Sequence, residues 1–101
     1  MTTDGAALLA PLIHMNGSSA ESLIEGYLAA ATLLTKGLEA LYACAPNGRD
    51  YYPCATQSEP NPFRQASREH DARINSVRQV LAEIEMIVEN IQEQQEARTG
   101  R

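Results

Sequence analysis

The densest group of chemically capable side chains in this chain lies in one short segment, Pro46-Asn47-Gly48-Arg49-Asp50-Tyr51-Tyr52-Pro53. A turn between two helices needs little more than an Asn-Gly pair and a proline. The arginine, the aspartate and the two adjacent tyrosines exceed that need, so the segment is predicted to be a binding site. The plainer alternative is that Arg49 pairs with Asp50 while Tyr51 and Tyr52 close the end of a helical bundle.

Two further arginines extend this predicted site. Arg64 and Arg68 are four residues apart on an expected helix, so they share a face. Guanidinium groups bind phosphate in a bidentate manner, a loop tyrosine stacks on a planar ring, and a helix N-terminus offers donors to an anion. These features together indicate a small anionic, nucleotide-like ligand. The predicted ligand-binding residues of this region are Asn47, Arg49, Asp50, Tyr51, Tyr52, Arg64 and Arg68.

A second candidate segment precedes the first helix and contains His14 and Asn16. A lone histidine is more often a packing residue than a catalyst. In one antiparallel hairpin this segment would lie roughly 40 Å from the Pro46–Pro53 loop, at 1.5 Å per helical residue. We therefore expect a composite ligand site at a subunit interface, with His14 and Asn16 of one chain beside Asn47, Arg49, Asp50 and Tyr51 of its partner.

Other chemistry has little support in the sequence. His70, within Arg68-Glu69-His70-Asp71, is expected to be a buried polar group paired with a carboxylate rather than a ligand-facing residue. No second His or Glu follows at a metal-binding spacing. Because there is also no nucleophile elbow and no phosphate loop, we expect a non-enzymatic protein with no catalytic residue, no metal and no cofactor.

These candidate residues are set between two expected helices. Asn61-Pro62 is a typical helix start, and from Ile74 onward apolar residues recur at alternating spacings of three and four. The first helix is expected to start at Ser18 or Ser19, where Ser18 and Glu21 have the spacing of a capping box. Its glycines, Gly26 and Gly37, each cost roughly 1 kcal/mol relative to alanine, so a packing reason for them is expected.

The sequence therefore predicts a single all-α domain over residues 1–101, an antiparallel two-helix hairpin with a short N-terminal arm. The expected parts are an arm at 1–17, helices at 18–45 and 62–97, a functional loop at 46–61 and a frayed tail at 98–101. Within the arm, residues 6–13 are expected to form either a short helix or an extended segment. Apolar residues lie on more than one side of each helix, which favours oligomerisation into a helical bundle, most simply a dimer.

Composition and charge restrict the partners further. The net charge of −5 argues against general nucleic-acid binding, which needs a basic surface. The N-terminus resembles neither a signal peptide nor a membrane span, so a cytoplasmic location without membrane association is expected, and Cys44 and Cys54 are expected to be free thiols. Five of the eight basic residues lie between Arg49 and Arg78, whereas five acids crowd residues 83–96. Antiparallel pairing of two hairpins would place the basic end of one beside the acidic end of the other.

Three segments together resemble small phage- and prophage-encoded proteins: His14-Met15-Asn16-Gly17-Ser18-Ser19, the Pro46–Pro53 loop, and Glu69-His70 with Arg73. Those proteins share an I-H-x-N-G-[TS]-S start, a P-N-G-R-D-Y-Y-P loop and an E-H-x-x-R helix. The resemblance covers about residues 12–91, and Cys54 with the stretch to Pro62 departs from it. A phage context would imply the host-cell cytoplasm and an analogy with viral sponge proteins, small helical oligomers that sequester the cyclic nucleotide immune signals of defence systems such as CBASS or Thoeris.

The leading expectation is thus a phage-type protein that binds a nucleotide-like ligand without catalysis and sequesters an immune signal. The alternative is a protein-interaction module that inhibits a host factor through its helical or acidic surface. Unpaired Arg49 and exposed tyrosine faces would favour the first hypothesis. Internally paired loop residues and an exposed apolar patch would favour the second.

Overall fold

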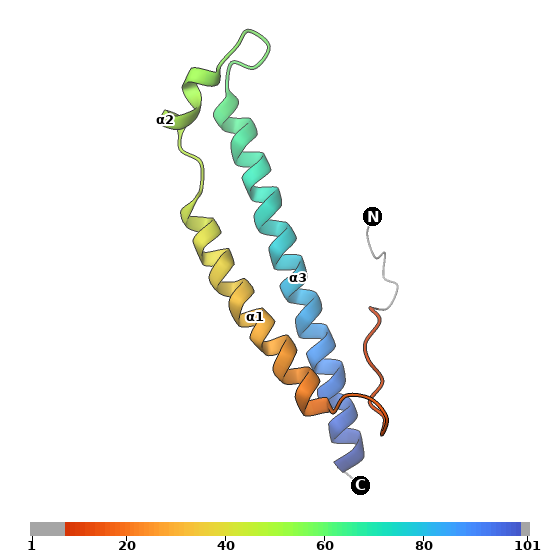
Figure 1. Ribbon diagram of the computed structural model, residues 1–101. Helices are drawn as coiled ribbons and strands as arrows, with labels where there is room; N and C mark the ends of the chain where they lie inside the picture. The colour runs from red at the N-terminus through yellow and green to blue at the C-terminus, as the bar shows by residue number, and fades with distance from the viewer. Residues whose placement is uncertain (1–7, 100–101) are drawn as a thin grey trace.

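The computed structural model describes residues 8–99, and these form helices and connecting segments with no strand. In chain order the elements are α1 (Ala20–Ala43), α2 (Gly48–Tyr51), the 3-10 turn η1 (Tyr52–Cys54) and α3 (Pro62–Thr99). The two long helices run antiparallel and side by side, with α2 and η1 beside the start of α3 (Figure 1). The predicted all-α class and the helical hairpin are confirmed for this part of the chain.

α3 begins where its sequence predicts. Pro62 is the first helical residue, and the side-chain oxygen of Asn61 accepts a hydrogen bond from the backbone N–H of Arg64 at 3.2 Å. This Asn-Pro start satisfies one of the otherwise unpaired N–H groups of the first turn. The helix continues to Thr99, two residues beyond the expected end at 97.

α1 is shorter at both ends than the expected 18–45. Ser19 rather than Ser18 is the N-cap, and its Oγ accepts a hydrogen bond from the backbone N–H of Ser22 at 3.0 Å. Cys44 is the C-cap, where its N–H donates to the carbonyl oxygen of Leu41 at 3.0 Å. The proline at position 46 disfavours helical conformation in the residue before it, which explains why the helix does not reach 45.

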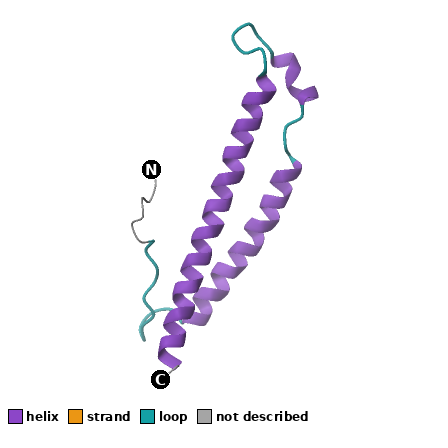
Figure 2. Ribbon diagram, turned by 180° about the vertical axis from the view of Figure 1, so that it is seen from behind, coloured by secondary structure: helices purple, strands orange, loops and turns teal. Residues whose placement is uncertain are grey.

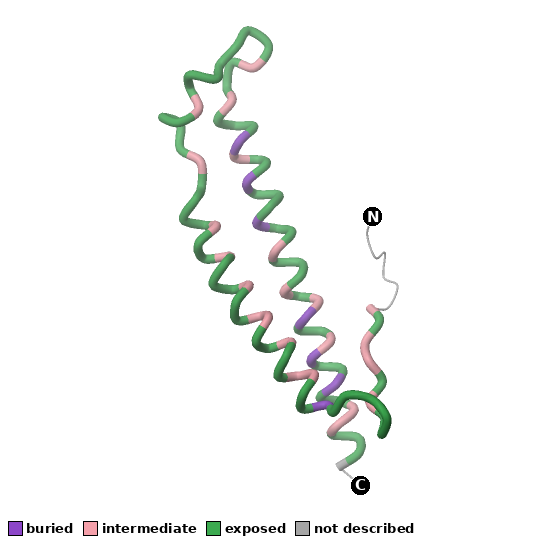
Figure 3. Tube along the Cα trace, viewed as in Figure 1, coloured by how far each residue is buried: buried purple, intermediate pink, exposed green. Residues whose placement is uncertain are grey.

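The buried side chains lie mostly on α3 and follow the predicted alternation. The buried apolar residues are Ala20, Ala66, Ile74, Ile84, Val88 and Ile91. On α1 the inner residues are half-buried and only Ala20 is buried, so one copy of α3 covers α1 incompletely (Figure 3). The radius of gyration is 20.0 Å, against about 13 Å for a compact domain of this length. The chain is therefore extended rather than compact.

The N-terminal arm lies on the side of α3 that faces away from α1 (Figures 1 and 2). Residues 8–14 are extended and contain no helix, which corresponds to the second of the two conformations expected for this segment. Residues 6 and 7 lie outside the described part. Because the arm packs on the far side of α3, it leaves the outer surface of α1 uncovered.

Candidate functional site

The segment expected to be an open loop contains a short ordered helix. Asn47 caps α2, because its Oδ1 accepts from the backbone N–H of Asp50 at 3.2 Å and its Nδ2 donates to Oδ2 of Asp50 at 3.1 Å. The surplus polar chemistry of Asn47 and Asp50 is therefore used locally, in a capping pair. The alternative pairing of Arg49 with Asp50 does not occur.

The pairing leaves Arg49 available. Its side chain is exposed and makes no hydrogen bond or ion pair with any described residue. Tyr52 is 73% exposed, whereas Tyr51 is half-buried. The turn thus carries one free guanidinium and, three residues later, one exposed aromatic ring. These two groups are the part of the predicted ligand site that this chain supplies most clearly.

Arg64 and Arg68 lie on the side of α3 opposite the face that packs in the hairpin. Each comes two residues before a buried position, Ala66 or His70, and two residues turn an α-helix by about 200°. Both side chains are exposed and unpaired among the described residues, but they point away from the face of α3 that packs in the hairpin. One protomer therefore does not gather the three arginines into one cluster.

Two other arginines of the hairpin, Arg73 and Arg78, have partners within the chain, whereas Arg98 near the end of α3 has none among the described residues. Arg73 lies 3.9 Å from Glu69 in an exposed ion pair, and Arg78 donates from Nη1 to the hydroxyl of Tyr42 at 3.1 Å. Arg49, Arg64 and Arg68 are therefore three of the four arginines without a partner among the described residues, and Arg98 is the fourth.

The hollow at this end of the molecule has acidic walls. It has a volume of about 320 Å³ and lies between the turn and the first two turns of α3. Its lining residues are Tyr51, Cys54, Thr56, Glu59, Pro62, Gln65, Ala66 and Glu69. Two carboxylates and no cation line it, so an anion would bind outside this hollow, on the exposed side of α2 that carries Arg49.

The second predicted segment lies at the opposite end of the hairpin. His14 and Asn16 are exposed. The backbone N–H of Asn16 donates to Nδ1 of His14 at 3.3 Å, and that of Gly17 donates to the carbonyl oxygen of His14 at 3.1 Å. A Cβ at Gly17 would come within 2.8 Å of Nε2 of His14, so a larger residue there would displace the exposed imidazole. As expected, His14 and the Arg49 turn do not meet within one chain.

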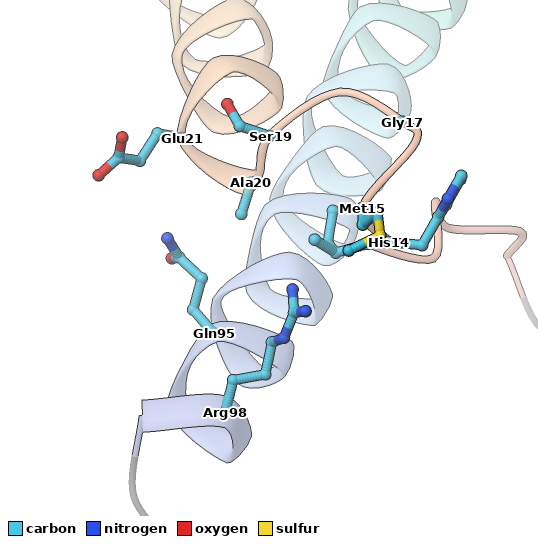
Figure 4. A pocket seen from close by; sticks show the side chains of 9 residues that line it. His14, Met15, Gly17, Ser19, Ala20, Glu21, Gln95 and Arg98 are labelled. Atoms are coloured by element: carbon cyan, nitrogen blue, oxygen red, sulfur yellow. The ribbon is translucent and has the colours of Figure 1, made fainter.

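A shallow pocket of about 410 Å³ lies at the arm end (Figure 4). The arm supplies Ile13, His14, Met15 and Gly17, the start of α1 supplies Ser19, Ala20 and Glu21, and α3 supplies Gln95 and Arg98. Sequence reasoning named His14 in this region but missed the two α3 residues. No local pattern identifies them, because their role depends on where the arm crosses the end of α3.

Gln94 hydrogen-bonds the arm to α3, a role that no sequence pattern indicates. Its Oε1 accepts from the backbone N–H of Ile13 at 2.9 Å, and its Nε2 donates to the carbonyl oxygen of Pro11 at 2.8 Å. Nε2 also donates to Oδ1 of Asn90 at 2.7 Å. One side-chain amide therefore pairs with both backbone groups of a passing extended segment.

His70 is buried, as expected, but the expected carboxylate is not its partner. The side chain is 7% exposed, and its Nε2 is a buried nitrogen with no hydrogen-bond partner among the described residues. A buried polar atom without a partner usually destabilises the fold. The neighbouring carboxylate of Glu69 contacts Gln65 and Arg73 instead.

Three further observations concern the described residues. They contain no group of three or more His, Cys, Asp or Glu side chains arranged to hold a metal ion. Cys44 and Cys54 are exposed free thiols, as expected. Across residues 8–99 no single helix has the length and apolar character to cross a membrane, and just the bent combination of Ala20–Ala43 with Gly48–Cys54 meets those criteria jointly.

No protein family, curated protein or solved structure matches this chain.

Proposed function

We propose that this chain is a non-catalytic binding protein that takes a small anionic, nucleotide-like ligand at the turn carrying Arg49. The observation that carries the proposal is an exposed, unpaired Arg49 on a capped helical turn, followed three residues later by the exposed Tyr52. A free guanidinium and an exposed aromatic ring on one short turn suit a phosphate joined to a base. A phage-type role in sequestering an immune signal would follow from such binding.

The proposed site is completed by a second copy of the chain. One protomer offers one free guanidinium at the turn, and a nucleotide needs more contacts than that for tight binding. His14 and Asn16 of the partner are the residues we assign to the other side of the ligand. Arg64 and Arg68 would contact an anion from α3 only if the ligand or the partner reaches around that helix.

A thermal-shift screen with cyclic dinucleotides, cyclic trinucleotides and ADP-ribose derivatives tests the proposal. We expect a ligand that raises the melting temperature by several degrees, since binding to the native state alone stabilises it. Arg49→Ala should abolish the shift. Lys36→Ala, which removes an exposed cation from the middle of α1, should retain it. Absence of any shift, or an equal shift in the Arg49→Ala protein, would contradict the proposal.

One observation favours a second candidate, the protein-interaction module. Leu33 on α1 is 70% exposed and Leu28 is 50% exposed, and exposed large apolar residues often mark a protein contact. A nucleotide screen without response, followed by loss of host-protein capture in Leu28→Glu, would support this candidate over the ligand-binding function.

A further inference from the structure

The outer flank of α1 is apolar and only partly covered, because four of its six residues are exposed and two, Leu23 and Ala30, are half-buried. Projected around the helix at 100° per residue, one row lies beside the face that packs on α3. This row, the outer stripe, consists of Leu23, Gly26, Ala30, Leu33, Gly37 and Ala40. The three glutamates of α1, Glu21, Glu25 and Glu39, project away from this row, whereas Lys36 lies at its edge, about 40° from Ala40. A Cβ built at Gly26 or Gly37 meets no atom within 4 Å, so neither glycine is explained by packing inside the chain.

The exposed area of the chain is large enough for a stable interface. Its accessible surface is 7767 Å², whereas a compact monomer of 11.0 kDa exposes about 5,600 Å². The difference, roughly 2,000 Å², is well above the roughly 800 Å² that each partner buries in a standard interface. The chain therefore has enough exposed surface to supply one partner's share of a standard interface.

The outer stripes of two copies fit each other when the two α1 helices run antiparallel. If a second α1 runs antiparallel about a twofold axis midway between Ala30 and Leu33, each residue faces the one at equal distance beyond the axis. Gly26 of one copy then faces Gly37 of the other, and Ala30 faces Leu33. Each large side chain meets a small one and the glycines allow close approach, which is the fit required of an isologous interface.

The charges at the two ends of the hairpin also favour the antiparallel arrangement. Residues 49–78 contain five arginines and four acids, whereas residues 83–98 contain five glutamates and one arginine. The antiparallel arrangement brings the slightly basic end of each hairpin beside the acidic end of the other. A parallel arrangement would place the two acidic ends together.

We infer that two copies of this chain pair through the outer stripe of α1, antiparallel, about a twofold axis between Ala30 and Leu33. This inference deepens the proposed function, because it brings the Arg49 turn of one copy to the same end as the His14 segment of the other. The assembly can be measured without any ligand, so failure of the nucleotide screen and failure of this interface are distinguishable.

Sedimentation equilibrium of a matched pair of variants provides the first test. Gly26→Leu/Gly37→Leu fills the gap that the partner would enter, while leucine remains a good helix former and meets open space within the chain. We expect at least a 100-fold rise in the dimer dissociation constant with unchanged helical circular dichroism. Thr32→Leu adds similar bulk on the opposite flank and should leave association unchanged. Dimers of wild-type affinity in the glycine variant, or a monomeric wild type, would overturn the inference.

Cysteine crosslinking tests whether the two α1 helices run antiparallel, whatever the number of chains in the assembly. In a Cys44→Ser/Cys54→Ser background, Gly26→Cys and Gly37→Cys chains are prepared separately, mixed and oxidised. A disulfide needs Cβ atoms about 4 Å apart, so we expect crosslinks between unlike chains and none within either preparation alone. Efficient self-crosslinking of Gly26→Cys would show a different pairing, and absence of crosslinks in the mixture would exclude the contact.

Discussion

Ser19 and Ser18 are adjacent serines with different roles at the start of α1. The Oγ of Ser19 accepts the backbone N–H of Ser22, whereas Ser18 makes no side-chain hydrogen bond with any described residue. Ser19→Ala should lower the free energy of unfolding by about 1 kcal/mol, the usual effect of losing an N-cap. Ser18→Ala should change it by no more than a few tenths. Urea unfolding of both variants measures the difference, and equal effects would show that Ser18 shares the cap.

The polar residues of the turn have different roles that their residue types alone do not reveal. Asn47, Arg49, Asp50 and Tyr52 were all singled out by type. Sequence alone could not show which of them pair within the chain and which remain free. Asn47 and Asp50 reach each other only once α2 forms. After that pairing, Arg49 and Tyr52 remain as the groups free to contact a ligand.

At the scale of elements, the arm depends on a single side chain of α3. Gln94→Ala removes the hydrogen bonds to Pro11 and Ile13, each with a net contribution of about 1 kcal/mol. We expect a loss of about 1–2 kcal/mol in unfolding free energy and faster hydrogen exchange at the Ile13 amide.

Gln79→Ala is the matched control for the arm. Gln79 also lies on α3, but it makes one long 3.5 Å contact to Glu83 within the same helix. Its replacement should leave the exchange rate of Ile13 unchanged. Equal protection of Ile13 in the Gln94→Ala protein would mean that the arm is held by its apolar contacts instead.

The long helices were predictable because their signals are local and repeated. Asn61-Pro62 marks the start of α3, and the alternation from Ile74 to Ile91 identifies its buried side. The capped helix α2 was missed because four residues carry no periodicity. The pairing of Gln94 with Ile13 joins residues 81 positions apart, so no window of sequence contains both partners.

At the scale of the whole molecule, the opposite charge of the two ends has a measurable consequence for the proposed pairing. Salt screens charges over about 10 Å at 0.1 M ionic strength. Raising sodium chloride from 50 mM to 500 mM should therefore raise the dimer dissociation constant a few-fold, while the apolar stripe continues to hold the pair. Sedimentation equilibrium across this range provides the measurement. A dissociation constant that falls with salt would mean that the ends repel one another.

The extended shape of the whole molecule also explains why one chain has a small core. Half-buried inner residues on α1 and a radius of gyration of 20.0 Å describe a hairpin that leaves much of its apolar surface exposed. The sequence indicated this through apolar residues on more than one side of each helix. The sequence could not show which flank of the hairpin remains uncovered, because that depends on the side of α3 to which the arm binds.

The way Gln94 binds the arm bears on how this protein can change over evolution. Its amide contacts the backbone of Pro11 and Ile13, and these atoms are the same whatever side chains the neighbouring residues carry. Leu9, Leu12 and Met15 are 91%, 78% and 90% exposed. Substitutions at these three positions can therefore accumulate without releasing the arm, which leaves its outer surface free to diversify while its position stays constant.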